Sequence, residues 1–150
     1  MTYELFLYNK KRMPSYYTEA VCEYRKRLSR YCKTDYVLIK KEKLWLREWE
    51  KAQKRILILP GRRSVPSERF SEQLSKWEME GPAKISFFIP DITLQEGWYA
   101  DADQKLQSGS LYYEILNLSE FTMEPGMTGM ILLEQIYRGY RILNHHPYHK

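Results

Sequence analysis

Short apolar runs alternate with helical stretches along most of this chain, and the alternation limits its possible folds more than any other feature. The apolar runs predict strands at residues 3–8, 36–40, 56–59, 85–89 and 111–118. Strands separated by helices form βαβ units, in which parallel neighbours are joined by a helix packed on one face of the sheet. We therefore predict an α/β fold over residues 1–150 as a single domain, with a parallel-rich sheet and helices on both faces.

The stretches between the strands carry apolar residues at spacings of three and four, the period of a helix with one buried face. The first predicted helix begins at Ser15, whose hydroxyl can cap it, and runs to about Tyr31. Its buried stripe comprises Tyr17, Val21, Tyr24, Leu28 and Tyr31. The other predicted helices cover residues 42–55, 67–81 and 127–143. Leu46, Trp49 and Gln53 fall on one side of the first of these, and Phe70, Leu74 and Trp77 are in register along the second.

Composition argues against several classes of protein. The longest stretch without a charged residue is 125–133, whereas a membrane-spanning helix needs roughly 20 apolar residues. The first residues lack the basic region and apolar core of a secretory signal. Cys22 and Cys32 are the only cysteines, too few for a disulfide scaffold or a four-cysteine zinc site, and Cys22 is predicted to be a small packing residue. We therefore expect a reduced, cytoplasmic protein with no membrane partner.

Positive charge is concentrated in the first part of the chain. The protein carries 24 Lys and Arg against 19 Asp and Glu, a net charge of +5. Residues 1–33 hold eight basic and three acidic residues, so this segment accounts for the whole excess. A basic face of this kind can bind nucleic-acid phosphates, and Arg25, Lys26 and Arg30 are the candidate RNA-binding residues. A solvated helix surface is the alternative interpretation.

Several familiar binding and catalytic motifs are absent from the sequence. It contains no G-x-x-x-x-G-K-[ST] phosphate loop, no G-x-G-x-x-G turn and no G-x-S-x-G nucleophile elbow. His145, His146 and His149 cluster in the last six residues, but no carboxylate or cysteine lies near them in sequence. A terminal segment is also poorly preorganised for a metal ion. We therefore predict no metal site.

Three stretches of the chain carry a resemblance to a known family. The most specific is residues 132–138 (LLEQIYR) followed by Pro147-Tyr148-His149-Lys150. Residues 23–31 (EYRKRLSRY) match the first helix of that family, and residues 116–123 (LNLSEFTM) resemble its loop before the last helix. In these motifs, in length and in element order, the chain resembles the RlmH-type SPOUT methyltransferases. That family modifies a pseudouridine of large-subunit ribosomal RNA.

The resemblance implies a C-terminal trefoil knot, a homodimer and S-adenosylmethionine held in the knot, with large-subunit ribosomal RNA or the ribosome as partner. The cofactor-binding residues that it implies are Leu57, Leu118, Ser119, Glu120, Phe121, Thr122 and Met123. It also implies that Tyr148 and His149 lie near the target base, on a tail that closes the partner subunit's site. His149 is the tail's candidate proton acceptor at neutral pH. A contact that holds the tail on the partner subunit is the alternative role of His149.

The positions at which the family binds its cofactor and its target differ in this chain. The family's Gly-Gly-x-x-Gly turn after the fourth strand reads Pro-Asp-Ile-Thr-Leu at residues 90–94, and proline has no amide hydrogen to donate. The family's aspartate falls on Ile58, while its histidine and arginine fall on Pro125 and Gly129. We therefore predict that S-adenosylmethionine binding is weak or lost.

Two functions remain open at this point. One is a methyltransferase of large-subunit ribosomal RNA, and the other is a catalytically inactive paralogue that binds RNA or the ribosome. The segment 90–110 is longer than in the family, and Gly97 or Gly109 could rebuild the pocket there. In either case the last helix predicts a homodimer through its apolar residues Met130, Ile131, Leu133, Ile136, Tyr137 and Tyr140. Glu134 and Arg138, four residues apart on that helix, predict an ion pair.

Overall fold

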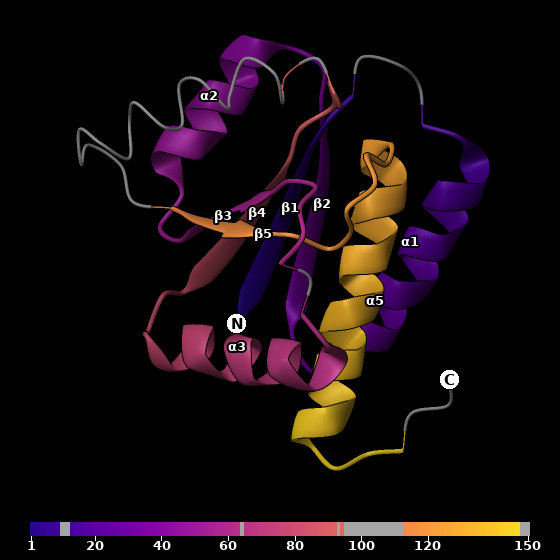
Figure 1. The fold of residues 1–150 in the computed structure, drawn as a ribbon, viewed down its shortest axis with the longest axis vertical. Helices are drawn as coiled ribbons and strands as arrows, with labels where there is room; N and C mark the ends of the chain where they lie inside the picture. The colour runs from indigo at the N-terminus through magenta and orange to yellow at the C-terminus, as the bar shows by residue number, and fades with distance from the viewer. Residues whose placement is uncertain (10–12, 64, 93, 95–112, 148–150) are drawn as a thin grey trace.

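The structure, a computed structural model, describes residues 1–9, 13–63, 65–92, 94 and 113–147. Figure 1 shows its helices and strands. In chain order they are β1 (Thr2–Tyr8), α1 (Ser15–Leu28), β2 (Lys33–Ile39), α2 (Glu42–Lys51), β3 (Arg55–Ile58), α3 (Ser67–Met79), β4 (Lys84–Ile89), β5 (Glu114–Leu116) and α5 (Pro125–Leu143).

The strands form one sheet in the order β2-β1-β4-β3-β5. The neighbouring strands of this sheet are parallel, and β1 lies between β2 and β4 with Tyr3 in register with Thr34 and Ile85. Parallel neighbours need a crossover connection, and the helices between the strands provide it. The predicted α/β class and the parallel sheet are therefore confirmed.

Two hydrophobic cores cover the two faces of the sheet, because successive residues of a strand point to opposite faces. The odd-numbered residues of β1, such as Tyr3 and Leu5, belong to the core beneath α1, α3 and α5. Phe6 of the same strand belongs to the other core, with Trp45 and Trp49 of α2. Figure 1 shows α2 on one side of the sheet and α1 with α5 on the other. Helices on both faces were predicted, and this is confirmed.

The first helix begins and ends differently from the prediction. Pro14 is its N-cap residue, and Ser15 is already helical and makes no capping hydrogen bond. Instead, the Tyr17 amide donates to the Pro14 carbonyl at 3.1 Å. The helix ends at Leu28, and the next residue closes the turn through Ser29 Oγ, which donates to the Lys26 carbonyl at 2.6 Å. The serine cap and the helical placement of Tyr31 were therefore wrong.

Two tryptophans anchor α2, and only one of them, Trp49, belongs to the predicted stripe. Trp45 and Trp49 are 0% and 1% exposed, whereas Gln53 lies beyond the end of the helix at Lys51. The guanidinium of Arg55 explains this end, because its Nε donates to the Trp49 carbonyl at 2.5 Å. The bond satisfies a carbonyl at the end of the helix where β3 begins. The predicted helix over residues 42–55, with Gln53 on the same side as Trp49, was therefore too long.

Cys22 is also placed differently from the prediction. It is exposed on α1, so it is not a packing residue. By contrast, α3 buries Phe70, Leu74 and Trp77 as predicted, and Gly81 follows it with a φ of 88° that favours glycine.

The last part of the chain follows the predicted order with shifted bounds. The strand β5 is only three residues long, and residues 111 and 112 of the predicted strand lie outside the described residues. The helix α5 begins at Pro125, two residues early, and proline suits the first turn because it needs no amide partner there. Within the described residues, none of the helices is long and apolar enough to span a membrane.

Candidate functional site

The loops that follow β3, β4 and β5 meet at one end of the sheet, which we call the carboxyl end because the strands terminate there. Two of them are joined directly: the Leu59 amide donates to the Leu116 carbonyl at 3.2 Å, and the Gly61 amide donates to the Ser119 carbonyl at 2.9 Å. The Asn117 side chain also donates to the Leu59 carbonyl at 2.9 Å. In open α/β sheets, ligands bind at the carboxyl ends of the strands, so this is the candidate site.

Glycine is required at position 61 by this close approach of the two loops. A Cβ atom there would lie 2.4 Å from Oδ1 of Asn117, far inside van der Waals contact. The side-chain amide of Asn117 donates to the carbonyl of Leu59, two residues before Gly61. The pair Gly61 and Asn117 therefore fixes the spacing of the loops after β3 and β5. Sequence reasoning missed this pair, although Asn117 lies within the matched stretch 116–123.

A small hollow lies where the three loops meet. Its volume is about 20 Å³, which is room for roughly one water molecule. Four of the predicted cofactor-binding residues line it, namely Leu118, Ser119, Phe121 and Met123, together with residues of the loops after β3 and β4. The loop from Leu118 to Met123 therefore lies at the candidate site, and its role in binding the cofactor stays a prediction. A nucleoside-sized ligand fits only if this loop moves outward.

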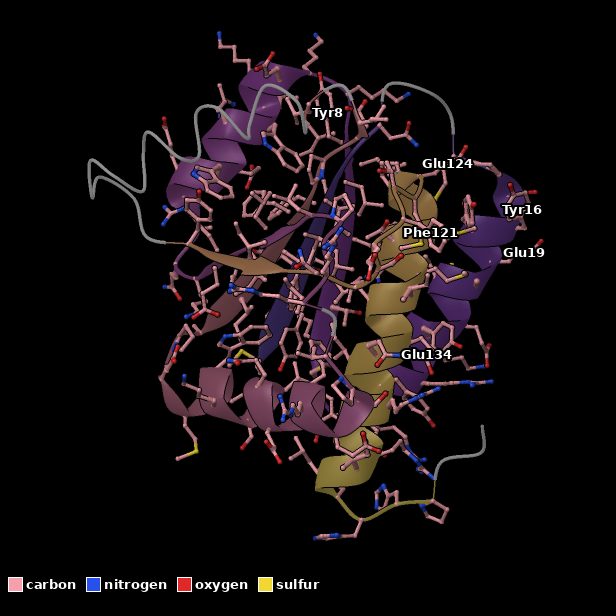
Figure 2. All side chains as sticks on the ribbon, in the orientation of Figure 1. Tyr8, Tyr16, Glu19, Phe121, Glu124 and Glu134 are labelled. Atoms are coloured by element: carbon pink, nitrogen blue, oxygen red, sulfur yellow. The ribbon has the colours of Figure 1, made fainter. Side chains whose placement is uncertain are left out.

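The tip of that loop is the part best able to move. Glu120 and Thr122 are exposed and do not line the hollow, and the Phe121 side chain is 81% exposed. Figure 2 shows Phe121 beside the first turns of α5. The Phe121 amide is bound by Ser119 Oγ at 2.8 Å, a local bond that an outward movement of the whole tip preserves. Displacing the tip therefore removes little apolar surface from the core.

Leu57 lies apart from these residues. Its side chain is fully buried in the core beneath α2, while its neighbours Ile58 and Leu59 border the hollow. The alternation of side chains along β3 turns Ile58 to the other face of the sheet, whereas Leu59 shares the face of Leu57 and lies beyond the end of the strand. Leu57 therefore lies within the strand beneath α2 and does not line the hollow.

The residues that replace the family's glycine turn contribute unequally to the hollow. Pro90 is buried and lines it. Asp91 does not line it, because its carboxylate accepts the amide of Leu94 at 2.8 Å. Leu94 lies in the core beneath α2. Of the three substitutions, only the proline directly borders the candidate site.

Gly129, on which the family's arginine falls, has its space filled by another residue. A Cβ atom at position 129 would lie 2.5 Å from the hydroxyl oxygen of Tyr36 and 3.1 Å from Leu7. The Tyr36 hydroxyl is buried without a hydrogen-bond partner among the described residues, and burial raises its pKa. An arginine cannot occupy this position unless Tyr36 moves. Nothing in the sequence indicated that a residue of β2 would take this space.

The candidate RNA-binding residues on α1 lie at the other end of the sheet, which we call the amino end. Since α1 runs antiparallel to β1, its last turn lies near the start of the strands, where the Lys33 amide bonds the Met1 carbonyl at 3.1 Å. The guanidinium of Arg25 donates there to the Thr34 carbonyl at 2.7 Å. Lys26 and Arg30 are exposed. The three residues are therefore remote from the hollow of the same chain.

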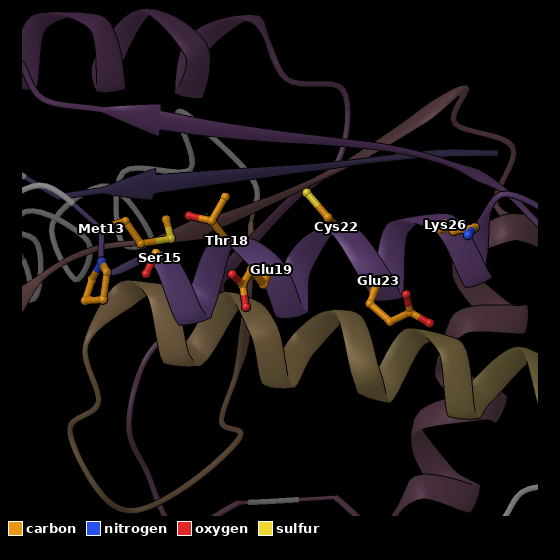
Figure 3. A pocket seen from close by; sticks show the side chains of 8 residues that line it. Met13, Ser15, Thr18, Glu19, Cys22, Glu23 and Lys26 are labelled. Carbon is orange, nitrogen blue, oxygen red and sulfur yellow. The ribbon is translucent and has the colours of Figure 1, made fainter.

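The surface of α1 is less basic than the sequence suggested. Figure 3 shows a groove along this helix, of about 770 Å³, into which Glu19 and Glu23 project beside Lys26. Arg27 is paired with Glu23 at 3.1 Å. These carboxylates reduce the attraction of this face for phosphate.

The start of the C-terminal tail is fixed at the amino end. His146 Nδ1 lies 2.9 Å from the Tyr31 hydroxyl, and the Arg141 Nε donates to the Pro147 carbonyl at 3.1 Å. Tyr148 and His149, the predicted catalytic residues, lie outside the described residues. The predicted ion pair of α5 is present, with Arg138 and Glu134 joined at 2.9 Å. Among the described residues, no cluster of three or more potential metal ligands occurs.

Comparison with known proteins agrees with this arrangement. The family model described as a predicted SPOUT methyltransferase matches residues 1–149, so the chain belongs to the SPOUT methyltransferase family. Within it, the chain is similar to proteins named ribosomal RNA large subunit methyltransferase H. That of Thermotoga neapolitana is 30% identical, over 92% of this chain and 93% of the relative. That of Leuconostoc mesenteroides is 31% identical, over 93% of this chain and 94% of the relative. Methyltransferase H 1 of Thermoanaerobacter sp. strain X514 is 29% identical over the full length of both chains. The predicted family is confirmed.

Proposed function

We propose that this protein methylates large-subunit ribosomal RNA with S-adenosylmethionine as methyl donor, and that its target is a pseudouridine. The observation that carries the proposal is the meeting of the loops after β3, β4 and β5 around one hollow, in a chain that matches the family over residues 1–149. Full-length relatives named as ribosomal RNA methyltransferases support the choice of substrate.

The residues at the carboxyl end have the chemical character that binding the adenosyl part of such a cofactor requires. Leu118 and Met123 offer apolar side chains, and the loop backbone offers donors and acceptors beside Ser119. Glu120 and Thr122 lie on the exposed tip that must open, and Leu57 stabilises β3 from behind. When bound, the cofactor supplies a methyl group on a positively charged sulfur. The substitution at Pro90 removes one backbone donor, so we propose that binding is weaker than in relatives that keep the glycine turn.

The protein's contribution to the reaction is chiefly positioning. Closing the loop tip over the hollow excludes water and holds the target nitrogen in line with the methyl group. That nitrogen must lose its proton, and a neutral imidazole is suited to accept it. We assign this role to His149, with Tyr148 contacting the target base.

Chain geometry favours a tail supplied by a second subunit. Thr128 lines the hollow, and Arg141, which binds Pro147, is 13 residues further along α5. At a helical rise of about 1.5 Å per residue, the two lie about 20 Å apart. His149 is only two residues beyond Pro147, and two residues span about 7 Å at most. The tail therefore serves the hollow of a partner, in a homodimer whose subunits carry the family's trefoil knot.

Two measurements test the proposal. Calorimetric titration with S-adenosylmethionine should show binding, and labelled cofactor should transfer its methyl group to large-subunit ribosomal RNA from a bacterium without its own family member. His149→Gln should lose transfer and keep cofactor binding. His145→Asn serves as the control, because asparagine tolerates the positive φ of 56° at that position. Binding of RNA without cofactor binding or transfer would instead identify an inactive paralogue.

A further inference from the structure

A second groove lies between α3 and β5, and the proposed reaction does not use it. Its volume is about 600 Å³. Figure 1 shows α3 lying across the sheet, below β5 in that view. The α3 wall presents Arg69, Glu72 and Lys76 on one helix face, at spacings of three and four, and Arg63 adds a third basic residue from the loop after β3.

Positive charge dominates the available groups of this groove. Within the described part of the chain, no side-chain hydrogen bond or ion pair engages Arg63, Arg69 or Lys76, and all three are exposed. The carboxylate of Glu114 is already engaged, because Lys54 donates to one of its oxygens at 2.8 Å and Trp77 Nε1 donates to the other at 2.8 Å. Lys54 also donates to Glu80 at 3.0 Å, so it offsets the Glu114 charge only in part. Glu72 is the lining carboxylate that remains available. The groove therefore offers three cations against one available carboxylate.

Apolar side chains accompany these cations. Ile115 of β5 is 50% exposed and Val65 is 40% exposed, and both line the groove. Exposed apolar groups beside unpaired cations suit a strand of RNA, whose bases and riboses contact the former while its phosphates contact the latter. A surface that binds phosphates alone does not require such exposed apolar side chains.

The groove also leads to the candidate site. Asn117 lines the groove at one end, and the next two residues, Leu118 and Ser119, line the hollow. A strand lying in the groove therefore arrives within two residues of the loop that encloses the cofactor. The α1 cluster at the amino end has no such continuity within one chain.

We infer that the groove between α3 and β5 binds a single-stranded segment of the RNA substrate adjacent to the target nucleotide. The inference rests on the proposed function for the identity of the RNA. Arg63, Arg69 and Lys76 bind its phosphates, and Ile115 contacts its bases or riboses. Glu72 limits the affinity by repelling the same phosphates.

The test compares two triple variants of the full-length protein with equal loss of charge. Arg63→Gln/Arg69→Gln/Lys76→Gln removes the groove's cations, and Lys40→Gln/Lys43→Gln/Arg47→Gln removes three exposed cations on and near α2. Binding to a single-stranded ribosomal RNA fragment is measured at several salt concentrations. The groove variant should bind roughly tenfold more weakly or worse at low salt, and its salt slope should fall by about two. The control should change the slope far less, and both variants should retain the wild-type affinity for S-adenosylmethionine.

A variant with the opposite effect guards against a loss caused by misfolding. Glu72→Gln should tighten RNA binding about twofold to fivefold, because it removes the one repelling charge. Equal RNA affinity in the wild type and the groove triple variant would overturn the inference, as would binding of an acidic peptide in preference to RNA. Groove-dependent RNA binding without methyl transfer would support the groove and overturn only the proposed activity.

Discussion

The two ends of the sheet are held together in different ways. At the carboxyl end, the loops around the hollow are joined mainly through their backbones, such as by the bond from the Gly61 amide to the Ser119 carbonyl. At the amino end, side chains converge: the Tyr3 hydroxyl donates to Glu78 at 2.9 Å, and the Tyr140 hydroxyl donates to the same carboxylate. One end is thus built from loop backbones and the other from a cluster of bonded side chains.

The cluster at the amino end continues to the tail. Tyr140 stacks on Tyr31 with ring planes 8° apart, and Tyr31 contacts His146. Burial, followed by the proximity of Tyr140 and Glu78, raises the pKa of Tyr3, so its phenol stays protonated and remains a donor. Each end carries a stretch that resembles the family, the start of the tail at the amino end and residues 116–123 at the carboxyl end. The carboxyl end also carries Pro90, where the resemblance expects a glycine.

The largest effect is expected from restoring the family's arginine at the carboxyl end. Gly129→Arg places a side chain where the Tyr36 hydroxyl already lies, and it buries a charge without a partner. Overpacking and an unpaired buried charge together should cost about 4 kcal/mol or more. We expect little folded protein, measured by thermal denaturation and circular dichroism.

A neighbouring substitution controls for the arginine itself. Met127→Arg on the same helix, at a position 36% exposed, should change stability by less than about 1 kcal/mol. Normal folding of Gly129→Arg would show that Tyr36 moves aside easily, and that the carboxyl end accommodates the family's residue.

The next effect concerns the amino end. Tyr140→Phe removes a hydrogen bond to the Glu78 carboxylate, and bonds to charged groups contribute about 1.5 to 3 kcal/mol. Urea denaturation should show a loss in that range. Tyr24 of α1 is half-buried and its hydroxyl makes no hydrogen bond among the described residues, so Tyr24→Phe should lose less than about 0.5 kcal/mol. Equal stabilities of the two variants would remove the distinction between the two ends.

Local periodicity predicted the elements of this fold because most of them are regular. The stripe of α3 at Phe70, Leu74 and Trp77 and the fully buried β3 are examples in which the pattern alone specifies burial. The predictions failed at helix ends, where Pro14 rather than Ser15 precedes α1 and Arg55 fixes the end of α2. Those ends depend on contacts that no local pattern records.

The candidate site was predictable only where a sequence motif carried it. The loop from Leu118 to Met123 was found by resemblance, and the structure brings four of its residues to the hollow. The filling of the space at Gly129 by Tyr36 joins residues 93 positions apart, so it depends on the order of the strands. The direction of the Asp91 side chain depends on the local turn, which the substitution itself does not reveal.

A smaller effect should follow from changing the proline beside the hollow. Pro90→Gly restores one backbone amide and should tighten S-adenosylmethionine binding about fivefold, the equivalent of one hydrogen bond of about 1 kcal/mol. Pro82→Gly, in the turn between α3 and β4, is the matched control and should leave the affinity unchanged. Unchanged affinity in Pro90→Gly, measured by calorimetry, would mean that this turn does not limit cofactor binding.

The smallest effect is expected from the basic residues at the amino end. Lys26→Gln/Arg30→Gln removes the two exposed members of the α1 cluster and leaves Arg25, whose bonds to Thr34 make it structural. If both lysine and arginine contact RNA phosphates, the salt slope of RNA binding should fall by about one, since each contact to a single strand contributes roughly 0.7. Glu19 and Glu23 on the same helix lower the attraction, so the loss of affinity should be smaller than in the groove triple variant. A larger loss here than in the groove would place the main RNA surface at the amino end, where the tail also begins.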